Sequence, residues 1–546
     1  MCAARSTFPG AAPVWRFSHY AGLFHDEFDP GSAWIRENAE LRLPPGTGSQ
    51  TFVLRGEFRP RPDARGLEAG APGLVCQVDG IAAGRLNQLS PGPFELHLAI
   101  PPSSGDRGPR ISLKLTGVGL TNFLAWLGRI SGLKALQHFR TQHKNRQLRI
   151  TRLVDSSGEV IFDFSIRLAP YSAAYARKHA RLGLNIAGFL TADLGVGESA
   201  RCMVRAADAA GIPAALVPLK LHCKNRLGDQ TYAGRLQAAN PHPVNVVHLD
   251  PPATHDLDSH HGKTFRAGKY NIAYWAWELP EFPDAWIPNF GYFDEVWCPS
   301  EFVRAAIAHK SPLPVITMPH AITIPQPAAN GRARFGLPEG KFLFLCLYDL
   351  NSYSERKNPR GMLEAFRQSG LAGSQAALVV KVQNAAGNEA DFAELMAAAT
   401  GQPGIVLLTE TLSRAEICQL ESACDCFLSL HRSEGFGLAI AECMALGKPV
   451  ISTDWSAPTE FVTAQNGCPV HYTLTTLTQS RGPYSKGQVW AEPDAAHAAW
   501  WMKKLCADRA LGTALGAAAA STIAAQFAPA VIGARYRRRL ESIACF

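Results

Sequence analysis

Short runs of alternating apolar and polar residues, separated by glycine and proline, occupy much of the N-terminal third of the chain. The letters DSSG form a turn between the last two runs. Such spacing is typical of antiparallel strands in a β-sandwich. The runs are QTFVLRGEF, GLVCQVDG, FELHLAI, RISLKLTG, QLRITRLV and EVIFDFSI. We therefore predict a β-sandwich-like domain over residues 1–178.

An amphipathic helical insert is predicted within this domain, at residues 121–146. Apolar residues recur there every three or four positions, and the segment is basic. Two interpretations stay open: the apolar face packs on its own domain, or the helix lies on an anionic membrane surface. The apolar positions are Phe123, Trp126, Leu127, Ile130, Leu133, Leu136 and Phe139.

From about residue 182 the pattern changes to apolar strands that alternate with helices, in two successive series. A stretch rich in proline, asparagine and glycine near residues 325–333 separates the series. Buried strands alternating with helices imply parallel sheets that are covered on both faces. The predicted fold class is α/β, with two doubly wound Rossmann-like domains at residues 180–328 and 334–525 that follow the antiparallel domain.

Composition narrows the class of protein. The 546 residues are 47% hydrophobic and 18% charged, as in an ordinary globular protein, and the net charge of +8 is small for this length. A dedicated nucleic-acid binder would carry a concentrated basic stripe, so we expect no nucleic-acid partner. The 13 cysteines include no C-x-x-C pair, which favours a reducing cytoplasm.

Two segments could be mistaken for membrane or export signals. The N-terminus MCAARSTFPGAAPVWRFSHY has no long apolar core and is not predicted to be a signal peptide. The charge-free run at residues 511–534 is rich in alanine and is interrupted by Pro529. We predict two soluble helices that meet at this proline, in preference to a transmembrane span.

The segment LHRSEGFGLAIAECMALGKPVIST, residues 430–453, carries most of the chemical signal. It follows the apolar strand CDCFLSL, so its loop lies at the carboxyl edge of a sheet, where ligands bind in open α/β folds. A helix is predicted to begin near Leu438, and its free N–H groups form an anion site. Gly435 and Gly437 have no Cβ and let a diphosphate approach the backbone on either side of Phe436.

Two glutamates in this segment suit a sugar nucleotide. Glu442 lies just over one turn into the helix, where its carboxylate can accept hydrogen bonds from the two hydroxyls of a ribose. Glu434, in the loop, would face a second polyhydroxyl unit. The alternative is a strand-loop-helix with two surface glutamates.

This segment resembles the E-x7-E signature of retaining glycosyltransferases with the GT-B fold, the group often called family 4. The resemblance covers roughly residues 180–546. It implies two facing Rossmann-like domains, with the nucleotide-sugar donor on the second and the acceptor on the first, and a last helix at 526–546 that returns to the first domain. It also implies that no metal or other cofactor is needed.

The same resemblance points to cationic donor ligands after the first strand of the second sheet. Lys357 in RKNP matches the family's lysine on the donor diphosphate. The usual arginine position is occupied by YDLNS, so Arg356 could substitute for it. Fixed cations stabilise the charge that develops on a leaving diphosphate. The alternative is an exposed cluster at a helix start.

Gly195 and Gly197, in GFLTADLGVGESAR, resemble the family's glycine loop, which approaches the donor phosphate and the acceptor. The same letters match the loose dinucleotide fingerprint G-x-G-x-x-A. That alternative is disfavoured because the loop begins several residues beyond the strand. In addition, no acid ends the next strand, AALVPLK, where a ribose partner would be required.

The acceptor side is predicted from two strand ends. Where the family often has a histidine, this chain has Trp277 and Glu278. Glu278 could orient an acceptor hydroxyl, support an oxocarbenium-like state, or be a structural loop acid. Trp275 and Trp277 alternate along a strand, so we expect one to face the core and the other the cleft, where an indole can stack on a sugar. His248 ends another strand and is either an acceptor contact or part of a surface loop.

We thus interpret the chain as a cytoplasmic, metal-independent retaining hexosyltransferase, as the resemblance implies. The resemblance leaves room for peripheral contact with the inner face of the membrane. Its acceptor would be a glycan or a lipid-linked oligosaccharide of bacterial surface polysaccharide synthesis. A departing phosphate oxygen could take the acceptor's proton. Two rivals stay open: a GT-B sugar-nucleotide epimerase, and a non-catalytic carbohydrate-binding protein.

Overall fold

The computed structural model describes residues 20–26, 29–43, 50–59, 72–101, 108–117, 148–164, 182–325, 331–373 and 375–544. The chain divides into two compact units. We call Met1–Gly183 with Arg537–Phe546 the N-terminal unit, and Leu184–Tyr536 the α/β unit. The helical insert predicted at residues 121–146 lies outside the described residues.

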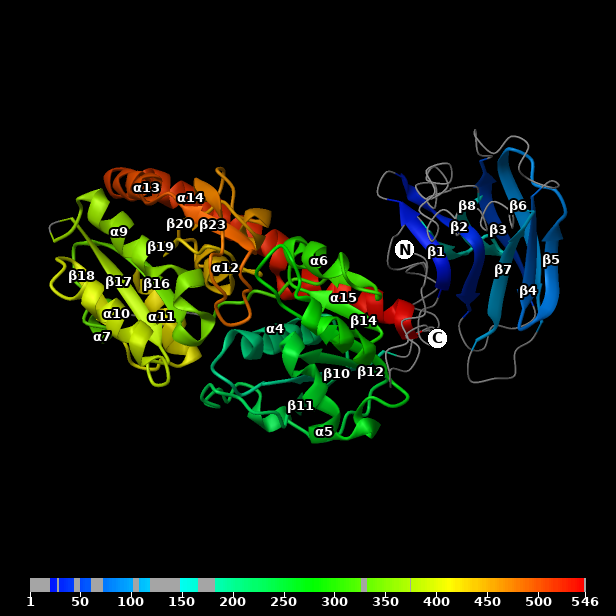
Figure 1. Cartoon of the computed structure of the whole chain (residues 1–546), viewed down its shortest axis with the longest axis horizontal. Coiled ribbons are helices and arrows are strands. Elements are labelled where there is room, and N and C mark those ends of the chain that lie inside the picture. Colours follow the sequence, from blue (N-terminus) through cyan, green and yellow to red (C-terminus); the bar gives the residue numbers. More distant parts are fainter. Residues whose placement is uncertain are drawn as a thin grey trace. The chain divides into compact units, whose positions relative to one another are not determined.

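In the described part of the N-terminal unit, nine antiparallel strands form one sheet (Figure 1). The strand order is β5-β4-β7-β2-β8-β3-β6, with β1 added to β2 and β9 to β8. The strands are β1 Tyr20–Asp26, β2 Asp29–Arg42, β3 Gln50–Phe58, β4 Gly73–Val78, β5 Ile81–Leu86, β6 Gly92–Ile100, β7 Arg110–Thr116, β8 Leu148–Asp155 and β9 Val160–Asp163. The six runs expected from the sequence are β3, β4, β6, β7, β8 and β9, so the antiparallel β class is confirmed.

The strands of this unit form one hydrogen-bonded sheet because different parts of β2 pair with β8 and with β7. Residues 33–35 pair with β8, and residues 38–42 pair with β7. The two edge strands of this sheet, β5 and β6, also approach each other, since a Cβ on Gly84 of β5 would lie 2.5 Å from the carbonyl oxygen of His97 in β6. Alternate residues point inward, and their side chains form the core, including Phe52, Leu54 and Phe162.

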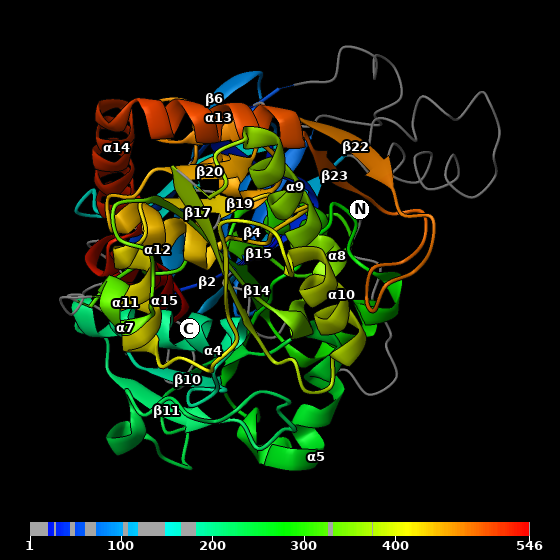
Figure 2. The same ribbon diagram turned by 90° about the vertical axis from the view of Figure 1, so that its left-hand side faces the viewer.

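The first sheet of the α/β unit is parallel and has the order β11-β10-β12-β13-β14-β15. We call this sheet with its helices the first lobe (Figure 2). Every residue of β10, β12, β13 and β14 is buried, which explains why these strands read as continuous apolar runs. The elements are β10 Leu184–Gly188, α4 Gly195–Ala209, β11 Ala214–Pro218, β12 Val244–His248, α5 Leu257–His261, β13 Tyr270–Tyr274, β14 Glu295–Cys298, α6 Glu301–Ala308 and β15 Val315–Thr317.

The second sheet, also parallel, has the order β18-β17-β16-β19-β20-β21, and with its helices it forms the second lobe. The elements are α7 Gly331–Arg334, β16 Phe342–Asp349, α8 Ser354–Lys357, α9 Pro359–Ser369, β17 Ala376–Gln383, α10 Glu389–Ala399, β18 Ile405–Leu408, α11 Arg414–Ala423, β19 Cys426–Ser429, α12 Leu438–Ala445, β20 Val450–Thr453 and β21 Cys468–Val470. The predicted fold class, two doubly wound α/β lobes after an antiparallel β region, is confirmed. Both lobes fall within one compact unit, and the domain boundaries drawn from the sequence stay predictions.

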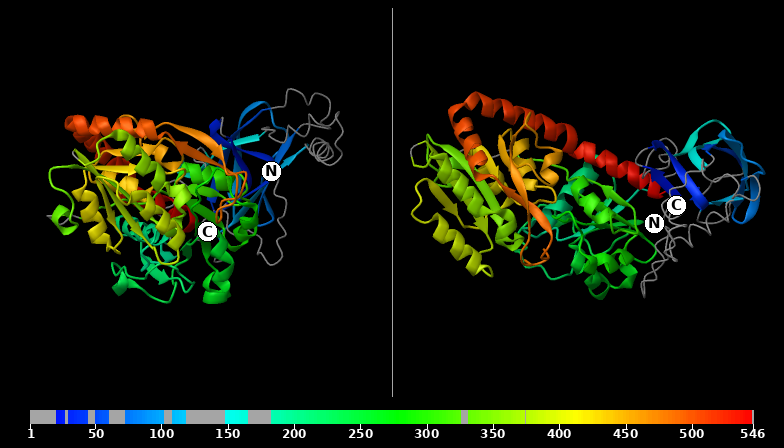
Figure 3. Two further views of the ribbon diagram at one scale, coloured as in Figure 1. Left: turned by 60° about the vertical axis from the view of Figure 1, so that its left-hand side comes forward. Right: turned by 45° about the horizontal axis from the view of Figure 1, so that its top comes forward.

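A hairpin, β22 Tyr472–Thr476 with β23 Val489–Pro493, follows the second sheet. Helix α13 Ala495–Ala507 then leads into α14 Arg509–Phe527 and α15 Pro529–Ala544. As predicted, two helices meet at Pro529 (Figure 3). Within the α/β unit α15 contacts the first lobe, because Tyr536 stacks on Trp297 with ring centroids 5.2 Å apart.

Among the described helices, one stretch, Arg509–Ile543, is apolar and long enough by those two criteria alone to cross a membrane. Its most apolar window has a mean hydropathy of 1.5, and 33% of that window is buried. Part of the stretch is fitted closely to protein, since a Cβ on Gly516 of α14 would lie 1.9 Å from the carbonyl oxygen of Gly447. These contacts are those of a helix packed on its own fold.

Candidate active site

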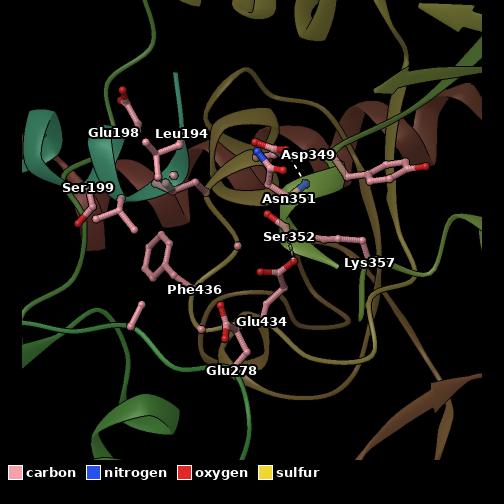
Figure 4. A pocket seen from close by; sticks show the side chains of 18 of the residues that line it. Leu194, Glu198, Ser199, Glu278, Asp349, Asn351, Ser352, Lys357, Glu434 and Phe436 are labelled. Atoms are coloured by element: carbon pink, nitrogen blue, oxygen red, sulfur yellow. Dashed lines mark hydrogen bonds and ion pairs between the residues drawn. The ribbon is translucent and has the colours of Figure 1, made fainter. Parts of the chain in front are cut away.

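A cavity of about 900 Å³ lies between the two lobes of the α/β unit (Figure 4). Its walls come from the loops after β10 and β12 of the first sheet, and after β16 and β19 of the second. In each sheet these are neighbouring strands whose connections leave in opposite directions. Such a switch point leaves a crevice at the carboxyl edge, so the topology itself places the cavity here.

The loop before α12 forms one wall of this cavity. Gly437 has φ +94°, a left-handed conformation that glycine adopts without strain, and it directly precedes the first helical residue, Leu438. The first-turn residues Leu438, Ala439 and Ile440 all line the cavity, so an anion there can reach the free N–H groups of the helix. The anion site expected from the sequence therefore has the required geometry.

Gly435 lies at a contact between the two lobes and also lines the cavity. A Cβ at this position would lie 2.9 Å from the carbonyl oxygen of Trp277, and the Gly435 carbonyl accepts a hydrogen bond of 2.7 Å from the Ser300 hydroxyl. Both partners belong to the first lobe. This glycine lets the two lobes approach each other, and its contact with a diphosphate stays a prediction. Phe436, next in the chain, lines the cavity and packs against His320 with ring centroids 4.8 Å apart.

Glu434 lies in this cavity and is paired with both cations expected from the sequence. The Lys357 ammonium donates to Oε1, and Nη1 of Arg356 lies 3.1 Å from Oε2. Burial raises the pKa of Glu434, but Lys357 and Arg356 outweigh it and lower this pKa to about 2. Burial lowers the pKa of Lys357, and Glu434 opposes that shift. The predicted cations are thus not an exposed cluster at a helix start.

Arg356 is 4% exposed and reaches across the loop. Its Nη1 donates to the Ser433 carbonyl at 2.9 Å, and Nη2 lies 3.8 Å from Glu278. Its Nε is buried without a hydrogen-bond partner. The Ser433 hydroxyl donates to the Glu278 backbone carbonyl, so the loop of Glu434 and the loop of Glu278 are held together across the cavity (Figure 4).

The two tryptophans after β13 are both buried, and of the two only Trp277 lines the cavity. Trp275 packs in an aromatic core with Phe282 and Phe290. Trp277 is 2% exposed, and its Nε1 donates to the Glu281 carbonyl at 2.9 Å. Trp277 does contribute to the cavity wall, but its indole is already packed against other rings.

Glu442 is 5% exposed and is bound by Arg414 through two hydrogen bonds of 3.0 and 2.6 Å. Burial raises the pKa of Glu442, and Arg414 opposes that shift. Arg414 also lies 4.0 Å from Glu198 at the start of α4, so one arginine faces a carboxylate from each lobe. Burial raises the pKa of Glu198, but Arg205, Arg414 and Arg201 together lower it to about 2. Glu442 is therefore not one of two surface glutamates.

A further buried carboxyl group interacts with this cluster. Glu421 of α11 is 1% exposed, and neither of its oxygens has a hydrogen-bond partner. Burial, together with the negative charge of Glu442, raises the pKa of Glu421 well above its usual range. Burial therefore favours the neutral form of Glu421 in the folded protein.

The two glycines expected in a loop lie in the first turn of α4, and only one of them lines the cavity. Gly195 lines the cavity. A Cβ on Gly197 would lie 2.7 Å from the carbonyl oxygens of both Phe189 and Ala192, so this glycine lets the first turn of α4 pack against the loop that precedes it. Our expectation that Gly197 approaches a donor is not supported by its position.

His248 is neither an acceptor contact nor part of a surface loop in this structure. It is fully buried, with Nδ1 3.0 Å from the Ser199 hydroxyl and its ring stacked on Tyr274. Burial lowers its pKa well below the usual range, so the ring is neutral. Ser199 lines the cavity, and His248 supports it from behind.

Several residues that line the cavity were not predicted from the sequence. Lys381 is a lone charge inside the apolar run AALVVKV, which is a signal that could have been used. It is 2% exposed, and its ammonium donates to the Val382 carbonyl at 3.0 Å. Burial lowers its pKa to about 8. His320, whose pKa burial lowers to about 3, and Tyr484 gave no local signal at all.

An amide network closes one side of the cavity. The Asp349 carboxylate accepts hydrogen bonds from Asn225 of the first lobe at 2.9 Å and from Asn384 at 2.7 Å. Among the described residues, no group of three or more His, Cys, Asp or Glu side chains is arranged to hold a metal ion. The independence from metal expected from the family resemblance stays a prediction.

Comparison with known proteins gives a domain assignment for part of the chain. Residues 329–472 match the family model described as glycosyl transferases group 1, so the chain contains a domain of this kind. A search of curated protein sequences found no match. The matched residues include the Glu434–Glu442 segment and both predicted cations.

Several solved structures are similar to part of the chain. HepE of Anabaena, in complex with UDP and glucose, is 15% identical with a TM-score of 0.47, over 65% of this chain and 98% of that one. Sucrose-phosphate synthase of Thermosynechococcus elongatus is 15% identical with a TM-score of 0.48, over 65% and 97%. A glycosyltransferase of Rickettsia africae is 13% identical with a TM-score of 0.47, over 66% and 97%. Similarities this low do not transfer a ligand or an activity.

Proposed function

We propose that this chain, which contains a glycosyl transferases group 1 domain, is a retaining glycosyltransferase that moves a hexose from a nucleotide-diphosphate sugar to a glycan or lipid-linked acceptor. One observation carries the proposal. Two buried cations, Lys357 and Arg356, converge on Glu434 in the same cavity as the open N-terminus of α12. A diphosphate that carries a sugar matches this set of charges.

In the proposed complex the diphosphate lies between the first turn of α12 and the Lys357–Arg356 pair. Both sources of positive charge are fixed by packing before any ligand arrives, so they stabilise the leaving diphosphate without reorganisation. The sugar–phosphate C–O bond breaks, and an acceptor oxygen forms a new bond to the same carbon on the same face. The acceptor's proton passes to the departing phosphate oxygen, so the step needs no protein base.

Glu442 is proposed to hold the ribose although Arg414 already occupies it. A carboxylate offers about four lone-pair positions, and the two hydrogen bonds from Arg414 use two of them. Two remain for vicinal hydroxyls. Arg414 then serves to orient the carboxylate and to keep it charged.

The acceptor class, the site of action and the biological role belong to the same proposal. Carboxylates and aromatic rings line the cavity end formed by the first lobe, a combination that suits a saccharide. All 11 described cysteines are free thiols, which agrees with a reducing cytoplasm. We propose that the enzyme acts there, peripherally at the inner face of the membrane where a lipid-linked acceptor requires it, and contributes to bacterial surface polysaccharide.

A donor panel tests the proposal. UDP- and GDP-sugars would be incubated with the full chain, and released nucleoside diphosphate measured with and without soluble and lipid-linked acceptors. We expect acceptor-dependent release that Glu442→Gln and Lys357→Ala each reduce at least about 10-fold, whereas Lys503→Ala, an exposed lysine of α13, leaves it unchanged. Sugar transfer that survives both changes would refute the assignment.

The same assay separates the two rivals. A sugar-nucleotide epimerase turns over donor without an acceptor and releases free product, so acceptor-independent turnover would favour it. A non-catalytic carbohydrate-binding protein would bind saccharide but show no turnover with any donor. NMR of the transferred anomeric centre decides whether the configuration is retained.

A further inference from the structure

A loop of the second lobe reaches the first lobe at the Glu278 end of the cavity. This loop, residues 477–488, connects β22 and β23 and follows the segment that matches the family model. We call it the cross-lobe loop. Its residue Gln488 donates to the Glu281 carbonyl of the first lobe at 2.9 Å, and Tyr484 and Pro483 line the cavity. At this end the cavity is completed by chain from both lobes.

Tyr484 makes the central contacts of the cross-lobe loop. It is 2% exposed, and its ring packs on Trp277 with centroids 5.6 Å apart. Its hydroxyl donates to Oε2 of Glu278 at 3.2 Å. The other oxygen of Glu278 lies 3.8 Å from Arg356. One carboxylate of the first lobe is thus oriented by two side chains of the second.

Tyr353 faces this contact from the loop after β16. Its φ of +63° is rare for a residue with a side chain, and such strain is retained only where the surroundings hold it. Gly482 packs directly against its ring, since a Cβ there would lie 2.2 Å from ring atoms, and Tyr484 meets the ring edge-on at 5.4 Å. Tyr353 remains 36% exposed and lines the cavity.

The same end of the cavity carries acceptors for hydroxyl groups. Asp250, after β12, lines the cavity together with Glu278 and Tyr353. Burial and the negative charge of Glu278 raise the pKa of Asp250 to about 6. Burial and the negative charges of both carboxylates raise the pKa of Tyr353. Trp286 is a further aromatic residue of the lining. Apolar rings beside paired carboxylates complement the C–H face and the hydroxyls of a sugar.

We propose that the cross-lobe loop, through Tyr484, completes an acceptor subsite for a hexopyranose ring and positions the Glu278 carboxylate toward the acceptor hydroxyl. This inference rests on the proposed function and deepens it. Tyr353 provides an apolar surface, Asp250 and Glu278 accept hydroxyls, and Tyr484 is a positioning residue. Acceptor recognition then depends on the donor-binding lobe, so a lobe opening that moves Tyr484 away from Glu278 dismantles the subsite.

A binding experiment tests the subsite without any turnover. Methyl glycosides of glucose, galactose, mannose and N-acetylglucosamine would be added to the full chain in the presence of UDP or GDP, and saturation-transfer NMR recorded. We expect transfer to the ring protons of at least one glycoside, with affinity about 3- to 10-fold weaker in Tyr484→Ala. Gly482→Ala should weaken it similarly by displacing Tyr353. Absence of a signal from every glycoside overturns the proposal.

Kinetic measurements distinguish a positioning role of Tyr484 from an effect on folding. Tyr484→Phe keeps the ring and removes only the hydroxyl, so kcat with acceptor should fall about 10-fold, while KM for donor and acceptor-independent hydrolysis stay within about twofold. The matched control is Tyr472→Phe, which removes a hydroxyl from the same hairpin at a residue that does not line the cavity. It should behave as wild type.

The outcomes are distinguishable from a failure of the proposed function. If wild type uses no donor but binds a glycoside in a Tyr484-dependent way, transfer is wrong and the subsite stands. If Tyr484→Phe retains the wild-type kcat, or lowers donor hydrolysis as much as transfer, Tyr484 has no positioning role and the proposal is overturned.

Discussion

Replacing Glu434 with glutamine isolates the charge at the centre of the candidate site. The carboxylate pKa is about 2 in the folded chain, against an ordinary value of 4.5. The shift corresponds to about 3 kcal/mol of stability. Because the folded pKa is depressed, this stability is fully present above pH 4.5 and is lost as the pH falls toward 2.

The loss of this stabilising free energy in Glu434→Gln predicts a lower melting temperature. An α/β unit of about 350 residues has an unfolding entropy of about 0.7 kcal/mol/K, so Glu434→Gln should lower its melting temperature by about 4 °C at pH 7. At pH 3.5 the difference should shrink by about 1.4 kcal/mol, or about 2 °C. Differential scanning calorimetry of the full chain measures both, with the exposed Glu339→Gln as control.

The same substitution should act oppositely on nucleotide binding. Without Glu434, the Lys357 and Arg356 cations are no longer neutralised, so UDP or GDP should bind about threefold more tightly in isothermal titration calorimetry. An unchanged melting temperature at pH 7 together with weaker nucleotide binding would refute this account of the site.

Further predictions concern the lobe contact and the buried acids. Gly435→Ala places a Cβ against a carbonyl of the first lobe and should lower the melting temperature by about 2 °C and transfer about 10-fold, whereas Gly234→Ala, with open space around it, should change neither. Glu421→Gln should raise the melting temperature by about 1–2 °C at pH 8 and by less at pH 5. The raised pKa favours protonated Glu421 in the folded chain, so the stability of the wild type falls as the pH rises above 4.5. A gain in melting temperature that does not grow with pH would contradict this. Arg414→Lys keeps the charge but loses the paired hydrogen bonds to Glu442, and it should weaken UDP or GDP binding about 10-fold in calorimetry; unaltered binding would exclude the ribose role.

Local pattern predicted many strands of this protein, but it missed β1, β2, β5 and β21–β23. Each run predicted from alternating or continuous apolar residues forms a strand in the structure, because the apolar positions of a strand indicate which of its faces are buried. The loop before α12 was also predictable, since Gly437 takes the left-handed conformation in which glycine is unstrained, and Glu434 precedes it within the same loop. Lys381 could have been found in the same way, as a charge in an apolar strand.

The sequence by itself determined most of the strands, their alternation with helices, and a loop with the chemistry of a sugar-nucleotide site. Only the tertiary structure decided which groups meet in that site. Arg414 pairs with Glu442, and Tyr484 reaches Glu278 from 206 residues away. The first contact joins two helices of the second lobe and the second contact joins the two lobes, so both depend on long-range packing that no local periodicity encodes.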